Sequence, residues 1–298
     1  MLYPKPPSQE PITHAKIQQM LSWAPRRFRL ADIDPVLKPP DSHATDWNLV
    51  FPFRETFVPA FESACSVEHL NFMSKGQQTF CYTFLKNVSQ EKIQALQTWL
   101  STIHQVVAIR DCLALSFALD YDRMQGSPNM PRTEIGTLRS QAKPYDAHAT
   151  AEHIVAAKEL GRRCLNFLGV VGSYNSATAV VSVPSSDPTQ GFSVPTEVAQ
   201  VIAEGSKLQN LSTLVRTTRP RPGLKNLPVS EKLKTIQETI AVHGDLRGQN
   251  ILLVDDLYQS GVTMNCVAMK LIEAGAKAVY GLACEKTCRN DANVSEVE

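Results

Sequence analysis

Short apolar runs alternate with helical patterns through the second half of the chain, and this alternation constrains the fold more than any other feature. Runs rich in β-branched residues predict strands, and apolar residues spaced three and four apart predict helices. Strands are expected at 177–183, 211–216, 251–254 and 278–284, and helices at 154–168, 196–203, 231–242 and 264–274. Strands joined through such helices run parallel, with helices on both faces of the sheet. The predicted fold class is therefore α/β, with a central parallel sheet flanked by helices.

The first 140 residues follow a less regular pattern. A serine-capped amphipathic helix is predicted over 89–104. The dense apolar run 106–121 fits a buried strand and a buried helix equally well. Gly and Pro residues mark 123–144 as a turn-rich bridge. We place the domain boundary there, and expect an α-rich or mixed N-terminal accessory region over 1–140, packed as a hood on a core over 141–298.

Composition excludes several classes of protein. A chain of 298 residues that is 43% hydrophobic can bury a large core, which excludes a disordered polymer. The formal net charge of +1 argues against direct nucleic-acid binding. No apolar run is long enough to span a bilayer and no secretion signal is present, so we expect no membrane partner and a cytoplasmic location. Seven cysteines without a CxxC pair predict reduced, buried thiols.

Two adjacent carboxylates follow a buried strand in the stretch ILLVDDLYQSGVTM, residues 251–264. Asp255 and Asp256 stand at the C-terminal end of this strand, where open α/β sheets bind ligands. Adjacent acids repel one another, so a strand and turn without a ligand would be destabilised by them. Carboxylates repel a phosphate but accept hydrogen bonds from sugar hydroxyls. The paired acids therefore predict a ribose site.

A glycine turn follows the acids and leads into a helix. Gly261 lets the backbone approach a ligand closely, and the helix N-terminus beyond it favours an anion. Ser260 and Thr263 add hydroxyls at the same place. Together with the acids, the turn predicts a ribose 5-phosphate lying over the end of the strand.

The sequence ILLVDDLYQSGVT resembles the thirteen-residue signature of type I phosphoribosyltransferases, which bind 5-phosphoribosyl 1-diphosphate (PRPP) with Mg²⁺. The region from about 145 to 285 is most similar to the competence-associated, ComF-like branch, although the zinc finger of that branch is absent. The resemblance implies that Asp255 and Asp256 act at the ribose and reach Mg²⁺ through hydroxyls or water. It implies phosphate contacts from Gln259, Ser260, Gly261, Val262 and Thr263. Gln259 replaces the small hydroxyl residue usual at that position.

Two further segments gain a role from the resemblance. Ser185 and Ser186 correspond to the loop that wraps the diphosphate, although alone they indicate only a turn. The segment 217–230 is rich in proline and basic residues, which favours either a basic lid over the diphosphate or a solvated loop. The lid candidates are Arg219, Arg221 and Lys225.

The leading functional interpretation is a Mg²⁺-dependent phosphoribosyltransferase that binds PRPP or a nucleotide and acts on a nitrogen nucleophile. The alternative is a nucleotide sensor, or a regulatory subunit of a DNA-uptake or defence assembly, that keeps the fold without transfer activity. A homo-oligomer or a larger assembly is expected. No residue indicates which base or amine is the acceptor.

Overall fold

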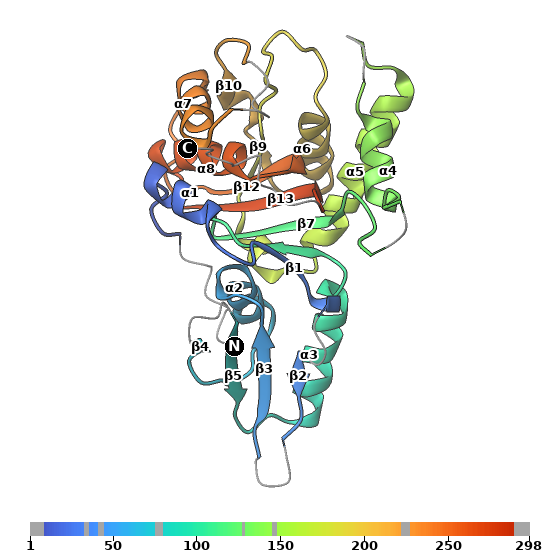
Figure 1. Ribbon diagram of the computed structural model, residues 1–298, viewed down its shortest axis with the longest axis vertical. Coiled ribbons are helices and arrows are strands. Elements are labelled where there is room, and N and C mark those ends of the chain that lie inside the picture. The colour runs from blue at the N-terminus through green and yellow to red at the C-terminus, as the bar shows by residue number, and fades with distance from the viewer. Residues whose placement is uncertain are drawn as a thin grey trace.

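The computed structural model describes residues 9–32, 36–40, 45–74, 80–126, 129–144, 148–221 and 227–288. Its largest sheet has seven strands, and Figure 1 shows it in the upper part of the molecule. In spatial order these are β1 (Arg27–Arg29), β6 (Val107–Ile109), β7 (Leu115–Tyr121), β13 (Ala278–Lys286), β12 (Asn250–Tyr258), β8 (Ala179–Ser182) and β9 (Gln209–Asn210). The strands from β7 to β9 are parallel, whereas β1 and β6 are antiparallel additions at one edge.

Helices cover both faces of the central sheet. One face packs against α4 (Glu134–Ala142), α5 (Ala151–Leu168) and α6 (Val194–Gly205). The other packs against α1 (His14–Leu21), α7 (Val229–Thr239) and α8 (Val262–Glu273). Successive residues of β12 point to opposite faces, so Leu252 and Val254 join one buried cluster while Ile251 and Leu253 join the other. The predicted α/β fold class is confirmed.

A second, smaller sheet lies beneath the edge strands β1 and β6 in Figure 1. Its strands are β2 (Leu37–Lys38), β3 (Trp47–Phe51), β5 (Cys81–Leu85) and β4 (Met73–Ser74), accompanied by α2 (Arg54–Ala64) and α3 (Gln90–Ile103). A cluster of buried phenylalanines, including Phe51, Phe57 and Phe61, fills the space between this sheet and α2. The same buried cluster continues to Phe117 of the central sheet. The small sheet therefore packs on the core through a shared interior.

The boundary predicted near residue 140 does not separate the two sheets. Strands β1, β6 and β7 all precede it and belong to the central sheet. The apolar run 106–121, which the sequence left open, forms β6 and β7 with a turn between them. The run is apolar on all sides because both faces of these strands are buried.

The predicted strand 211–216 is confirmed only at its end, since Val215 and Arg216 belong to a strand while the residues before them do not. After β9 the chain turns, with Ser212 N donating to Asn210 Oδ1 at 3.1 Å, and enters the short 3₁₀ helix η3 (Ser212–Leu214). It then forms β10 (Val215–Thr217), which pairs with β11 (Ile240–Val242) in a separate two-stranded sheet. The helix expected over 231–242 consequently ends at Thr239. The side-chain hydrogen bond from Ser212 N to Asn210 Oδ1 accompanies the turn that delays the strand to Val215.

The remaining elements are short. The chain also contains the 3₁₀ helices η1 (Leu30–Asp32) and η2 (Gly172–Ser176). In the described part of the chain, no helix combines the length and the apolar character needed to cross a membrane. All seven cysteines are free thiols, as predicted, and all except the half-buried Cys65 are buried.

Candidate functional site

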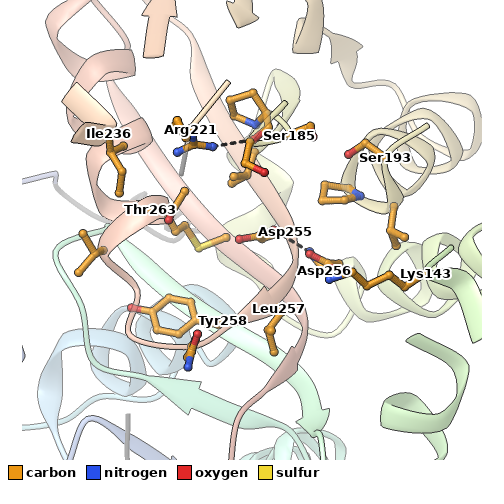
Figure 2. A pocket seen from close by; sticks show the side chains of 18 of the residues that line it. Lys143, Ser185, Ser193, Arg221, Ile236, Asp255, Asp256, Leu257, Tyr258 and Thr263 are labelled. Carbon is orange, nitrogen blue, oxygen red and sulfur yellow. Dashed lines mark hydrogen bonds between the residues drawn. The ribbon is translucent and has the colours of Figure 1, made fainter. Parts of the chain in front are cut away.

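The pocket opens where β12 continues beyond its neighbour β8. The pairing of β12 with β8 ends at Val254 and Ser182, whereas its pairing with β13 continues to Tyr258 and Lys286. The stretch of β12 that extends beyond β8 forms the floor of a pocket of about 520 Å³, seen in Figure 2. Its walls come from α4, the loop after β8, the N-terminus of α6, the segment before α7, and the turn into α8. This is the crevice at the carboxyl end of the strands where open α/β sheets bind ligands.

The turn at residues 259–263 has the geometry expected of an anion site. Gly261 is the N-cap of α8 and has a left-handed φ of +83°. A Cβ at this position would lie 2.0 Å from the hydroxyl oxygen of Tyr258, so only glycine fits. The first intrahelical bond of α8 runs from Asn265 N to Gly261 O, which leaves the N–H groups of the first turn without intrahelical partners. All five predicted contacts, from Gln259 to Thr263, line the pocket.

Asp255 and Asp256 also line the pocket, but they differ in environment. Removal from water and the neighbouring charge of Asp256 raise the pKa of Asp255 well above its usual range. Asp256 Oδ2 instead accepts hydrogen bonds from Nε and Nη2 of Arg139, each at 2.8 Å. Figure 2 shows the two carboxylates side by side. One acid is thus paired with a cation and the other faces the pocket beside it.

Arg139 connects the pocket to a second buried carboxyl. Its Nη1 lies 3.4 Å from Oε1 of Glu285 on β13, and burial raises the pKa of Glu285 to about 7. Oε2 of Glu285 is buried without a hydrogen-bond partner among the described residues. A single guanidinium therefore holds one carboxylate of the pocket and one behind it.

The opposite wall is the 184–193 loop, which follows β8. Ser185 and Ser186, the residues that the resemblance assigns to the diphosphate loop, line the pocket. Arg221 also lines it, and its Nη2 donates to Pro184 O at 3.3 Å while its backbone N donates to Ser186 O at 2.9 Å. Its Nε and Nη1 are buried and have no hydrogen-bond partner in the described structure. Arg221 thus presents unsatisfied donors beside the loop.

The other lid candidates have different positions. Arg219 is exposed and pairs with Glu238 at 3.2 Å, and it is not among the residues that line the pocket. Lys225 lies outside the described residues. Of the three predicted lid cations, Arg221 alone is placed at the pocket.

Sequence reasoning missed three cations that line the pocket. Arg139 and Lys143 come from α4 and the residue after it, and buried Lys232 comes from α7. Together with Arg221 they bring the lining of the pocket to four cationic and two acidic side chains. No signal in the sequence identified them, because each reaches the pocket through tertiary packing. An excess of positive charge in a crevice favours an anionic ligand.

The donor set for a metal is small. Within the described ranges, no three His, Cys, Asp or Glu side chains gather as a metal site. Asp255 and Asp256 remain, and one oxygen of Asp256 is bonded to Arg139. Magnesium is commonly held by one or two carboxylates together with substrate phosphates, and these residues fit that mode.

No family model and no curated protein matches the chain. Several solved structures show a limited likeness to it. A mutant hypoxanthine phosphoribosyltransferase from Trypanosoma cruzi is 10% identical, with a TM-score of 0.29, over 46% of this chain and 68% of that one. An alanine mutant from a study of an invariant aspartic acid in HPRTs is 11% identical, with a TM-score of 0.28, over 50% and 67%.

The third is a purine phosphoribosyltransferase from Pyrococcus horikoshii, 13% identical, with a TM-score of 0.27, over 47% of this chain and 86% of that one. With TM-scores this low, these likenesses carry no argument of their own. The fold class rests on the sheet topology, and the ComF-like branch stays a prediction.

Proposed function

We propose that the pocket binds PRPP with Mg²⁺ and that the protein is a phosphoribosyltransferase acting on a nitrogen nucleophile. The observation that supports this most is the presence, in one crevice, of a glycine turn at a helix N-terminus, two adjacent acids and a cationic wall. Each part suits a different part of the ligand. The assignment to the type I family belongs to this proposal.

The 259–263 turn is suited to the 5-phosphate. N–H groups without intrahelical partners at the start of α8 favour an anion, and the positive end of the helix dipole adds to them. The hydroxyls of Ser260 and Thr263 are at the same wall. A phosphate there would place the ribose over the exposed end of β12.

The acids are suited to the ribose hydroxyls. Asp256 accepts hydrogen bonds as a carboxylate, and its pairing with Arg139 fixes its orientation. The raised pKa of Asp255 favours its protonated carboxyl, which can donate to one ribose hydroxyl and accept from another. Hydrogen bonds to charged groups contribute about 1.5–3 kcal/mol each. The acids would thereby hold the sugar with C1 directed toward the middle of the pocket.

The chemistry would be displacement of diphosphate at C1 of the ribose through an oxocarbenium-like transition state. The bond from C1 to the diphosphate oxygen breaks, and a bond from C1 to the acceptor nitrogen forms. Arg221 and the 184–193 loop are suited to the negative charge that develops on the diphosphate, and Mg²⁺ bound with PRPP would neutralise the same charge. Ser185 and Ser186 supply hydroxyls there.

A nucleotide sensor without transfer activity is the second candidate, as is a regulatory subunit of a DNA-uptake or defence assembly. Two observations favour a binding role: Gln259 stands where the signature usually has a small hydroxyl residue, and Asp256 is already paired with Arg139. Both candidates bind a phosphoribosyl compound. They differ in whether the bound compound then reacts, which it does in a transferase and does not in a sensor. A homo-oligomer and a cytoplasmic location remain predictions under either.

Labelled PRPP, Mg²⁺ and a panel of bases separate the two candidates. Release of diphosphate with formation of a labelled nucleotide is expected for a transferase, and binding without release for a sensor. Asp255→Asn and Asp256→Asn should each weaken PRPP binding about tenfold or more. The matched control is Asp245→Asn, a surface change at a residue paired with Arg247. Wild-type protein that binds no PRPP in calorimetry with Mg²⁺ would refute the proposal.

A further inference from the structure

We infer that Arg26 and Lys286, two buried cations outside the signature, are positioning residues that orient the 259–263 turn for phosphate. This inference rests on the proposed function, since it assigns a role at the same site. The two residues come from near the two ends of the described chain, and neither lines the pocket itself.

Three consecutive carbonyls of the turn are bonded from behind. Lys286 Nζ donates to Gln259 O at 3.0 Å. Arg26 Nη2 donates to Ser260 O. Asn265 Nδ2 donates to Gly261 O at 2.8 Å. The side of the turn that faces the protein interior is thus a row of satisfied acceptors.

Because peptide groups are planar, a row of carbonyls that points inward directs the following N–H groups to the opposite side, where an anion can bind. In a trans peptide the C=O and the following N–H point in opposite directions, and the one cis bond among the described residues lies at Ala24-Pro25. When the carbonyls of residues 259, 260 and 261 are held inward, the N–H groups of Ser260, Gly261 and Val262 point away from the interior, and that of Val262 makes a long bond to Ser260 Oγ at 3.5 Å. These three residues line the pocket. Successive N–H groups directed into a concavity bind anions.

Both cations are held where their charge is poorly screened. Arg26 is 9% exposed and Lys286 is 1% exposed. Lys286 also lies over the ring of Tyr258, with Nζ 5.8 Å from the centroid. Charges removed from water act more strongly on a nearby phosphate than charges on the surface. The cations therefore serve the site in two ways, by orienting the backbone and by adding positive potential.

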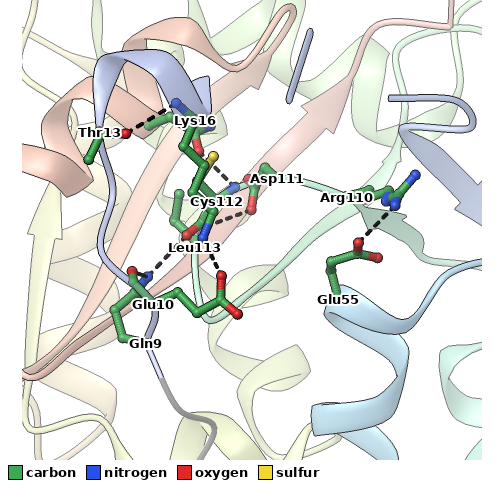
Figure 3. Close-up of polar contacts among 10 residues, drawn as sticks. Gln9, Glu10, Thr13, Lys16, Glu55, Arg110, Asp111, Cys112 and Leu113 are labelled. Carbon is green, nitrogen blue, oxygen red and sulfur yellow. Dashed lines mark hydrogen bonds and ion pairs between the residues drawn. The ribbon is translucent and has the colours of Figure 1, made fainter. Parts of the chain in front are cut away.

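The support beneath the turn extends to the loop at residues 110–113. Tyr258 OH donates to Oδ2 of Asp111 at 3.1 Å, and Asp111 Oδ1 accepts from Leu113 N at 3.0 Å. Figure 3 shows this loop, with Gln9 of the N-terminal arm against Cys112. Tyr258 is thereby fixed in the space that a side chain at residue 261 would need. The orientation of the turn is thus determined from several distant segments.

Calorimetry with ribose 5-phosphate and with inorganic diphosphate plus Mg²⁺ tests the inference. Arg26→Gln and Lys286→Met should each weaken ribose 5-phosphate binding about tenfold, the effect expected for one charge-assisted hydrogen bond. Diphosphate, which the proposal assigns to the opposite wall, should bind within about twofold of wild type. Arg26→Lys keeps the charge and should restore ribose 5-phosphate binding to within about threefold. Arg27→Gln is the matched control, because Arg27 also donates to a backbone carbonyl, Cys288 O at 2.8 Å.

The outcomes separate this inference from the proposed function. Wild-type protein that binds neither ligand refutes the proposed function. Wild-type binding with unchanged affinity in both cation variants overturns the inference alone. An equal loss of both ligands also overturns it, because the cations would then be merely structural. Thermal unfolding reports whether each variant folds, and if Arg26→Gln does not fold, Lys286→Met and Arg26→Lys still decide the question.

Discussion

Across the pocket from each other lie the 259–263 turn and the 184–193 loop, and they are held in different ways. The turn is bonded from behind by side chains that are distant in sequence, as its contacts with Arg26 and Lys286 show. The loop is anchored from outside at its start, where the carbonyls of residues 184–186 accept from Arg221 and Thr217. Its other bonds among the described residues are largely internal: Ser185 Oγ donates to Gln190 Oε1 at 2.6 Å, and Thr189 N donates to Asp187 Oδ1 at 2.8 Å. The turn therefore has its shape before a ligand arrives, while the part of the loop beyond Ser186 depends on local contacts that a ligand can replace.

This difference suits the two ends of the proposed ligand. The 5-phosphate does not react, so a fixed receptor positions the sugar with little cost of reorganisation. The diphosphate is displaced, so the wall that holds it must release it. If one wall of the pocket is preorganised and the other is adaptable, matched substitutions in the two walls should have unequal effects on binding and stability.

The largest difference is expected between two glycines. Gly261→Ala forces a left-handed residue and a clash with the Tyr258 hydroxyl, which should abolish ribose 5-phosphate binding. The backbone strain alone should lower the free energy of unfolding by about 1–3 kcal/mol. In Gly191→Ala, in the loop, the added Cβ has no atom within 4 Å, and the free energy of unfolding should change by less than about 0.5 kcal/mol. Urea unfolding and calorimetry on both variants check this, and equal effects would break the comparison.

The second prediction concerns the buried acid beneath the turn. Burial raises the pKa of Asp111 to about 6, while hydrogen bonds from Ser116, Leu113 and Tyr258 and the charge of Arg26 oppose the shift. Because the folded pKa exceeds the unfolded value of about 4, the stabilisation is full below pH 4 and is lost as pH rises through 6. The loss is at most about 3 kcal/mol. Urea unfolding from pH 4 to 7 should show this decline in wild type and a flatter profile in Asp111→Asn.

The loop should show the opposite sign. Hydrogen bonds from the Thr189 hydroxyl and N–H lower the pKa of Asp187. Its contribution is present above the usual aspartate pKa and lost as pH falls. Asp187→Asn therefore serves as the control for Asp111→Asn. Identical pH slopes in the two variants would contradict the assignment.

A smaller effect is expected at Arg221. Arg221 lines the pocket beside the loop and has two buried nitrogens without a hydrogen-bond partner among the described residues, so Arg221→Gln should weaken inorganic diphosphate binding about tenfold. Arg219→Gln removes an exposed pair with Glu238 and should leave the affinity unchanged. Calorimetry with Mg²⁺ and diphosphate measures both. A loss of ribose 5-phosphate affinity as large as that for diphosphate would show that Arg221 does not distinguish the two walls.

The smallest effect is expected at Ser185. Ser185→Ala removes the bond to Gln190 and should change the free energy of unfolding by about 0.5–1.5 kcal/mol. The change in diphosphate affinity should be a few-fold, because neighbouring Ser186 and Arg221 remain. Urea unfolding and diphosphate calorimetry provide the measurement, with Ser186→Ala as the matched variant.

The parts of the site that sequence predicted are those encoded locally. The acids, the glycine turn and the helix after it lie within one short stretch, so their types and spacing determine the geometry. Arg139 and Arg26 contact this stretch from 117 and 234 residues away. No periodicity or motif links such positions, because their proximity is a property of the folded sheet.

The same reason explains the successes and errors in the fold. Helix 89–104 has a serine cap and one apolar stripe, and it forms as predicted. Strands β6 and β7 were undecided because a run buried on both faces has no periodicity. The domain boundary followed the prolines and glycines of 123–144, whereas sheet pairing carries the core across that segment.

Strand β13 is the last described strand along the chain, yet it occupies the middle of the central sheet, between β7 and β12. During synthesis the ribosome therefore releases two half-sheets, each with an open hydrogen-bonding edge, before residues 278–286 emerge. Open edges of this kind can pair with other chains until β13 occupies the gap between them. The strand that joins the two halves also brings Lys286 beneath the 259–263 turn, so the same strand closes the sheet and completes the proposed phosphate site.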